Sequence, residues 1–232
     1  MSSRDWVRLP STWIDERGLA GLSWKAGGAG SDNTAALMAL TAIAHAADQE
    51  TGIARLTYDD LCDLTGLSRA KASNGLEILR GINVIERGPD GARSTYQLVN
   101  YARSHWAKLP VKSMYRRAGR IAAFDDFQLR LPAELEALKL FFLFVARRGR
   151  TSNVAHIGYE KIEEYTGIKR GRIKTGLSLL ATLSLVYVEP IPSGTNMYGV
   201  SNAYRIVGLD TYNHMGTRGR GMTAIDYNDA RT

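Results

Sequence analysis

Hydrophobic positions along the chain alternate between helical spacing and short strand-like runs, and the same order occurs twice. In the first half, the segment 33–48 carries apolar residues at the spacing of a helix face and is rich in Ala and Leu. Shorter helical patterns follow at 57–66 and 69–81. Two β-prone runs then flank the turn sequence GPDG at 88–91. The pattern predicts three helices followed by a hairpin.

A shift of 101 residues aligns the segment 58–86 on 159–187 without a gap. The identical positions include two pairs of glycines and two pairs of leucines: Tyr58/Tyr159, Thr65/Thr166, Gly66/Gly167, Arg69/Arg170, Gly75/Gly176, Leu76/Leu177 and Leu79/Leu180. Similar pentapeptides, WVRLP at 6–10 and WAKLP at 106–110, precede the two copies. The chain is therefore interpreted as two related modules in series, each approached by a WxxLP segment.

Local signals predict where the helices begin and end. Thr57 and Asp60 have the spacing of a capping box, and Gly66 is typical of a helix C-terminus. Ser68 is expected to cap the third helix, while Lys169 stands at the equivalent position and removes the hydroxyl cap from the second copy. The inward face of the third helix is predicted to carry Ala72, Leu76 and Leu79.

The sequences YDDLCDLTGLSRAKASNGLEILRGINVIER (58–87) and YEKIEEYTGIKRGRIKTGLSLLATLSLVYVEP (159–190) resemble the L-x-x-x-T-G-hydrophobic-S-R/K signature of bacterial winged-helix DNA-binding proteins. Two such modules in one short basic chain resemble plasmid and phage replication initiator proteins. The resemblance implies a mainly α fold with small β-hairpins (α+β), made of two tandem winged helix-turn-helix domains. The expected organisation is an N-terminal domain over 1–101, a basic linker over 102–133, a second domain over 134–208 and a flexible tail over 209–232.

Charge and composition narrow the expected partners. The chain has 30 Lys and Arg against 23 Asp and Glu, a formal net charge of +7, which favours polyanions such as nucleic acid. Its single cysteine, Cys62, excludes an intrachain disulfide. Neither a membrane span nor an apolar leader is expected, so a cytoplasmic location is predicted.

The third helix of each module is the predicted DNA reader, because its exposed N-terminal half can enter a major groove. In the first module this face offers Arg69, Lys71, Ser73 and Asn74. In the second it offers Lys169, Arg170, Arg172, Lys174 and Thr175. Arginine can pair with guanine and asparagine with adenine. Ordinary solvated helix faces are the alternative, and the basic residues at equivalent positions favour DNA contact.

Further DNA contacts are expected outside the third helices. Arg87 and Arg93 on the first hairpin could reach phosphate or the minor groove. The stretch 101–120 has six basic residues and no acidic one, and it is expected to follow the phosphate backbone: Arg103, Lys108, Lys112, Arg116, Arg117 and Arg120. A helical linker with a solvated basic face is the alternative. Trp6 and Trp106 are expected to pack the entry segments onto the modules.

No catalytic pattern is recognised in the sequence. Its four histidines lack metal-ligand spacing, no P-loop occurs, and Cys62 is expected to be partly buried on a helix. The chain is therefore predicted to be no enzyme, to need no cofactor and to bind no small-molecule substrate.

The leading functional hypothesis is sequence-specific binding of duplex DNA in replication initiation. A second copy of the chain and host replication proteins are further candidate partners. Transcriptional repression of a mobile element and a protein–protein adaptor built on winged helices are the alternatives; a nuclease would need catalytic residues that the sequence does not offer. Two different modules suit a site of two unequal halves or a direct repeat, whereas a symmetric palindrome is expected to need a dimer.

Overall fold

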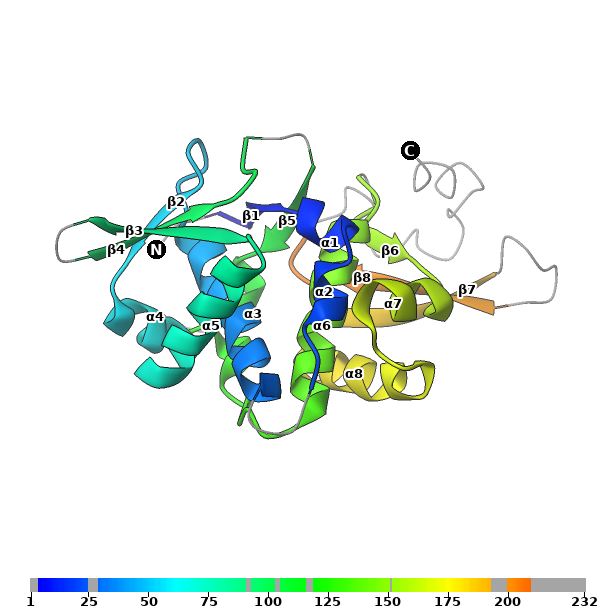
Figure 1. Ribbon diagram of the computed structural model, residues 1–232. Coiled ribbons are helices and arrows are strands. Elements are labelled where there is room, and N and C mark those ends of the chain that lie inside the picture. The colour runs from blue at the N-terminus through cyan, green and yellow to red at the C-terminus, as the bar shows by residue number, and fades with distance from the viewer. Residues whose placement is uncertain are drawn as a thin grey trace.

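Two long helices, α3 (Ala29–Ala46) and α6 (Pro132–Arg147), lie side by side at the centre of the computed structural model (Figure 1). The structure describes residues 4–24, 29–90, 93–102, 105–115, 119–150, 152–192 and 200–209. Both helices are buried along most of their length, as their apolar composition predicts. The fold is a mixed α+β arrangement of helices and small antiparallel sheets.

Each long helix is followed by the same succession of elements. After α3 come β2 (Ile53–Leu56), α4 (Tyr58–Thr65), α5 (Arg69–Gly81), β3 (Ile85–Asp90) and β4 (Arg93–Leu98). After α6 come β6 (Val154–His156), α7 (Tyr159–Thr166), α8 (Arg170–Thr182), β7 (Val186–Pro192) and β8 (Val200–Ile206). The sheets have matching orders, β2-β4-β3 and β6-β8-β7, and all their pairings are antiparallel. The predicted repeat is confirmed as a repeated order of elements, to which the structure adds a first strand in each sheet.

The predicted helix boundaries are confirmed in detail. Thr57 and Asp60 form the capping box of α4, and Gly66 ends that helix in the left-handed region at φ 75°. The Ser68 hydroxyl accepts a hydrogen bond from the backbone N–H of Lys71, whereas Lys169 gives α8 no side-chain cap. Ala72, Leu76 and Leu79 are buried. These signals are local, so the sequence alone suffices to place them.

The repeated glycines Gly75 and Gly176 allow the third helices to lie close against the long ones. A Cβ at Gly75 would come within 2.8 Å of the backbone nitrogen of Ala36 in α3. At Gly176 it would come within 2.8 Å of the Leu140 side chain in α6. A larger residue at either position would force the helices apart, which explains the shared glycine.

The two WxxLP segments pair with each other. They form the strands β1 (Trp6–Pro10) and β5 (Trp106–Pro110) of an antiparallel ribbon, with Arg8 opposite Lys108 at its centre. The indole rings of Trp6 and Trp106 stack on each other at 5.8 Å, and Trp6 also packs against the hydrophobic core, as predicted for its entry segment. Because the paired strands are equivalent, the ribbon has a local two-fold axis through its central pair.

The residues after β1 cross to the second copy. They form the short helices α1 (Thr12–Asp15) and α2 (Gly18–Gly21), which pack against α6 and α7. Trp13 packs against Phe142 of α6, with ring centroids 6.2 Å apart. The Lys139 amine in α6 donates to the carbonyl oxygen of Leu22 at 2.6 Å, and burial lowers the pKa of Lys139 to about 8. This crossing was not predicted.

The residues after β5 cross in the opposite direction. The backbone N–H of Ile121 donates to the Leu64 carbonyl oxygen in α4 at 2.9 Å, and the Tyr115 hydroxyl lies 3.0 Å from the His45 ring in α3. The segment 102–133, predicted as a linker, thus contains β5 and the 3-10 helices η1 (Lys112–Met114) and η2 (Ala122–Phe124). Buried residues of both copies form one continuous hydrophobic core.

His45 ties the end of α3 to the strand β5. Its Nε2 lies 3.0 Å from the carbonyl oxygen of Pro110, which can only accept, so Nε2 carries the proton and Nδ1 accepts from Tyr115. Burial lowers the pKa of His45 from 6.5 to about 4. Charged groups also line the adjoining hollow: Arg4, Asp48, Arg55 and Lys112.

This neutral histidine is expected to make stability depend on pH. Between pH 6.5 and 4 the unfolded chain binds a proton that the folded chain excludes, so the free energy of unfolding falls as pH falls through this window. The shift corresponds to about 3 kcal/mol, and because His45 is only partly buried as a residue, the expected loss is reduced to about 2 kcal/mol. Urea unfolding at pH 7 and pH 4 should show a smaller loss in His45→Gln than in the unsubstituted chain. Equal losses in both chains would contradict this origin.

Candidate nucleic-acid interface

The N-terminal ends of α5 and α8 present the residues predicted to read DNA. Both helices begin with arginine, Arg69 and Arg170, and neither has an acidic residue in its first turn. The preceding helices differ, because Asp59 and Asp60 lie in the first turn of α4 and Glu160 in that of α7. Unpaired backbone N–H groups make a helix N-terminus electropositive. Basic side chains and helix ends therefore add to the same positive potential at α5 and α8.

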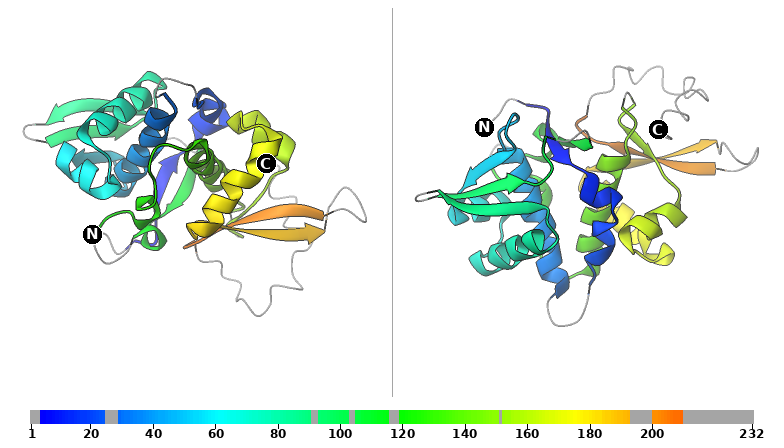
Figure 2. Two further views of the ribbon diagram at one scale, coloured as in Figure 1. Left: turned by 90° about the horizontal axis from the view of Figure 1, so that it is seen from below. Right: turned by 45° about the horizontal axis from the view of Figure 1, so that its top comes forward.

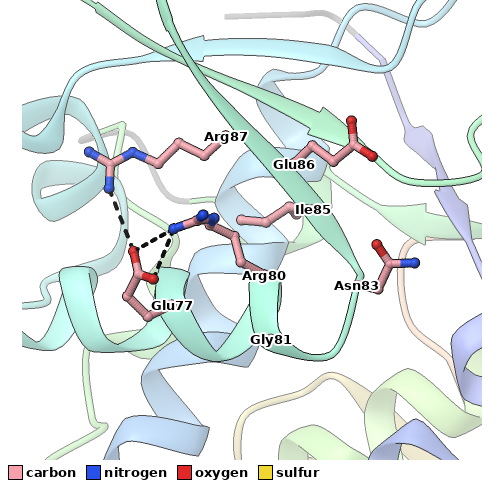
Figure 3. Close-up of a pocket in the computed structure, with 7 residues that line it drawn as sticks. All are labelled: Glu77, Arg80, Gly81, Asn83, Ile85, Glu86 and Arg87. Atoms are coloured by element: carbon pink, nitrogen blue, oxygen red, sulfur yellow. Dashed lines mark hydrogen bonds and ion pairs between the residues drawn. The ribbon is translucent and has the colours of Figure 1, made fainter.

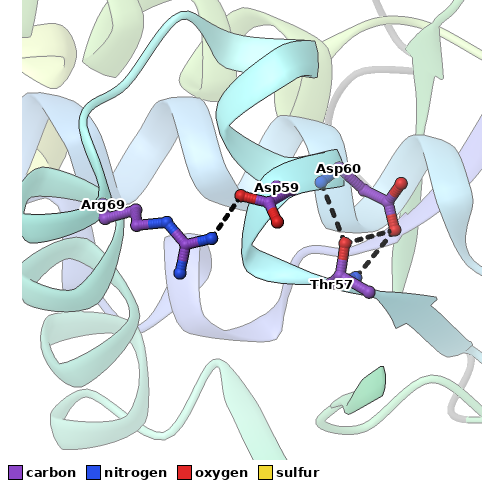
Figure 4. A network of polar contacts seen from close by, with 4 residues as sticks. All are labelled: Thr57, Asp59, Asp60 and Arg69. Carbon is purple, nitrogen blue, oxygen red and sulfur yellow. Dashed lines mark hydrogen bonds and ion pairs between the residues drawn. The ribbon is translucent and has the colours of Figure 1, made fainter. Parts of the chain in front are cut away.

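Arg69 is held only weakly at the start of α5. Its guanidinium reaches Asp59 on α4 at 2.5 Å, beside the capping box of Thr57 and Asp60 (Figure 4). The Arg69 and Asp59 side chains are 69% and 71% exposed. An ion pair so open to water contributes little stability, so Arg69 can leave Asp59 for another anion at small cost.

Lys71 and Arg172 occupy equivalent positions, and each is tethered to the long helix of its own copy. The Lys71 amine donates to Asp32 at 2.7 Å and to the Ser31 hydroxyl at 2.5 Å. Arg172 pairs through two nitrogens with Glu136, whose side chain is 12% exposed. Both were predicted as DNA contacts, and in this structure both have carboxylate partners. Their contacts orient α5 on α3 and α8 on α6, and the carboxylates partly neutralise the positive charge at these two positions.

The exposed face of α8 is the more basic of the two. Arg170, Lys174 and Thr175 are exposed, while Ile173 between them is buried as predicted. Within the part of the chain that the structure describes, neither Arg170 nor Lys174 has an ion-pair partner. Lys169 is 83% exposed and lies 3.5 Å from Glu163. One turn of helix thus offers two uncompensated cations on the same face, since positions four apart are neighbours.

The corresponding face of α5 is less charged. Asn74 is exposed and Ser73 half-buried, and beyond them the helix carries Glu77 and Arg80. Glu77 bridges Arg80 and Arg87 of β3, in an open hollow between the end of α5 and the hairpin (Figure 3). Arg87 also lies over the Tyr58 ring at 5.0 Å. These contacts satisfy Arg80 and Arg87, so the polar side chains of α5 that have no described partner lie in its first half.

Three basic residues of the stretch 101–120 are described by the structure, and each of them contacts a different group. Lys108 lies over the Trp6 ring at 4.8 Å, Lys112 pairs with Asp5 at 2.7 Å, and Arg120 lies 3.9 Å from Asp125. Lys112 lines the hollow beside His45, about 20 Å along α3 from Asp32. The structure therefore does not bring Lys112 together with the start of α5. The side chain of Arg93 and the whole of Arg103, Arg116 and Arg117 lie outside the described residues, as does the segment 210–232 of the predicted tail.

The described histidine, cysteine and acidic side chains are dispersed over the structure. Among the described residues, no group of three His, Cys, Asp or Glu side chains is arranged to hold a metal ion. Cys62 is half-buried on α4, as predicted, and burial raises the pKa of its thiol, which disfavours the reactive thiolate. No helix in the described ranges is long and apolar enough to span a membrane.

No protein-family model matches the chain, and no match was found among curated proteins.

Proposed function

We propose that the chain binds duplex DNA sequence-specifically through two tandem winged helix-turn-helix domains, with α5 and α8 as the recognition helices. One repeated observation carries this proposal. Both helices begin with an arginine, Arg69 or Arg170, and neither has an acidic residue in its first turn. In the winged-helix interpretation, β3–β4 and β7–β8 are the wings. Direct readout needs an exposed helix end with side chains that reach base edges, and Arg, Asn and Thr can do so.

Replication initiation from a plasmid-type or phage-type origin is the biological role that we propose for this binding. It rests on the resemblance of the tandem modules to initiator proteins. Repression of a mobile element would use the same DNA-reading surface. The arrangement of binding sites separates the roles: iterated copies beside an origin favour initiation, and one copy over a promoter favours repression.

The proposal is tested by selecting binding sites from random duplex DNA at about 150 mM salt, an ionic strength that screens weak nonspecific contacts. The unsubstituted chain is compared with Arg69→Ala and Arg170→Ala. We expect one enriched motif, with a different part of it relaxed in each variant. If no motif is enriched and the weak binding vanishes with added salt, specific reading is wrong and a protein–protein adaptor becomes the better explanation.

A further inference from the structure

We infer that one copy of the chain reads two half-sites in inverted orientation, so that a single polypeptide takes the place of a symmetric dimer. This inference rests on the proposed DNA-binding function and specifies the form of its substrate. It departs from the expectation that a direct repeat suits one chain and that an inverted repeat needs two. Three features of the structure carry it.

The first feature is the register of the β1–β5 ribbon. Trp6 lies opposite Pro110 and Pro10 opposite Trp106, so each strand meets its equivalent in the opposite direction. Arg8 of one strand lies over Trp106 of the other at 5.0 Å, and Lys108 lies over Trp6 at 4.8 Å. Such reciprocal contacts define an isologous interface, whose two sides are related by a half-turn. Modules related by translation, as on a direct repeat, would not make them.

The second feature is the reciprocal exchange of the segments that follow these strands. Ala20, in the crossing segment after β1, lies beside Gly167 at the end of α7. Arg120, after β5, lies beside Gly66 at the end of α4. Gly66 and Gly167 are equivalent in the repeat, so each copy covers the same site on the other. The half-turn therefore extends from the ribbon to the helix-turn-helix elements themselves.

The third feature is the position of the N-terminal ends of the proposed recognition helices, α5 and α8. Lys71 binds Asp32 near the start of α3, and Arg172 binds Glu136 near the start of α6. Both long helices begin at the same end of the molecule, the lower end in Figure 1. The view from that end shows the β3–β4 and β7–β8 hairpins projecting to opposite sides of the central helices (Figure 2, left). A duplex lying across this end would meet α5 and α8 in opposite orientations, as inverted half-sites require.

The two half-sites are expected to differ in sequence, because the reading ends 68–74 and 169–175 differ at five exposed or half-buried positions. Ser68, Ala70, Lys71, Ser73 and Asn74 in the first copy correspond to Lys169, Gly171, Arg172, Lys174 and Thr175 in the second. Because the two half-sites then have different sequences, their inverted arrangement does not appear as a palindrome in the bound DNA. Making the readers equal would reveal it.

The test equalises the readers within the full chain. In the first variant, α8 receives the α5 residues: Lys169→Ser, Gly171→Ala, Arg172→Lys, Lys174→Ser and Thr175→Asn. A second variant makes the reverse exchange: Ser68→Lys, Ala70→Gly, Lys71→Arg, Ser73→Lys and Asn74→Thr. Sites are selected from random duplexes long enough for half-sites one helical turn apart, and mass measurement of the complexes counts the chains per duplex. Circular dichroism melting identifies a variant that does not fold, and the other variant then decides.

We expect a palindromic motif bound by one chain. Reversing one half in place should weaken binding by at least about tenfold, because one reader then loses its base contacts. A motif with both halves in the same direction, or a palindrome that takes two chains, would overturn this inference and leave the proposed function standing. If the unsubstituted chain also selects no motif, both this inference and the proposed sequence-specific DNA binding are wrong.

Discussion

Replacing Trp13 by alanine is expected to lower the free energy of unfolding of the whole chain by about 3–5 kcal/mol, the usual cost of removing a buried aromatic side chain. Trp13 is only 9% exposed, packs against Phe142 in the second copy, and donates its indole N–H to the Pro10 carbonyl oxygen at 3.1 Å. The substitution opens a cavity where the first crossing segment meets α6. Because the core is continuous, both copies should unfold in a single, earlier transition.

Trp6→Ala is the matched control for Trp13→Ala. Trp6 is half-buried and stacks on Trp106 in the β1–β5 ribbon, so losing this ring contact is expected to cost about 1 kcal/mol. Urea unfolding followed by far-ultraviolet circular dichroism measures both variants without depending on tryptophan fluorescence. Equal losses for Trp6→Ala and Trp13→Ala would be inconsistent with the crossing, and so would two separate transitions of which only one moves.

Replacing Arg170 by alanine is expected to weaken binding to the selected duplex roughly 5- to 150-fold, the range for losing one base-reading arginine. Arg170 is exposed at the positive end of α8, and no described residue forms an ion pair with it. In the proposed complex, its guanidinium would contact DNA without first having to leave a carboxylate. The dissociation constant is measured by fluorescence anisotropy on the selected site and on a scrambled duplex.

Arg80→Ala removes the same charge from a different place and serves as the control for Arg170→Ala. Arg80 lies in the last turn of α5, paired with Glu77 at 2.9 Å and away from the reading end. Its loss should change the free energy of binding by less than about 0.5 kcal/mol, as for an ordinary surface substitution. If Arg170→Ala weakens the selected and scrambled duplexes equally, Arg170 holds phosphate and does not read a base. If Arg80→Ala matches it, total charge and not position governs binding.

The elements that were predictable from the sequence are those with local signals. The capping box at Thr57 and Asp60, the stop at Gly66 and the inward face of α5 depend on residues within a turn or two of one another. The strand β6 spans only Val154–His156, too short for an alternating pattern to stand out. β2 has four residues and was missed for the same reason.

Contacts between residues far apart in the chain could not be predicted from the sequence, because no periodic pattern indicates them. The WxxLP repeat was visible, but an antiparallel pairing of its two copies brings together residues about a hundred positions apart, and no spacing rule specifies such a partner. Lys71 and Arg172 looked like free cations because Asp32 and Glu136 precede them by 39 and 36 residues. One feature of the sequence does point to these ion pairs. The long helix of each copy carries an acidic residue near its start, and the basic residues Lys71 and Arg172 occupy the same position in the repeat.

The two modules that exchange crossing segments are parts of one covalent chain, and this affects how binding depends on protein concentration. A symmetric dimer held by exchanged segments separates into half-readers when its concentration falls below the dissociation constant. Here the crossing segments join parts of one chain, so the second half is present at a fixed effective concentration however dilute the protein becomes. Occupancy of a two-part site would then rise with the first power of protein concentration, and a few copies per cell could act without first finding one another.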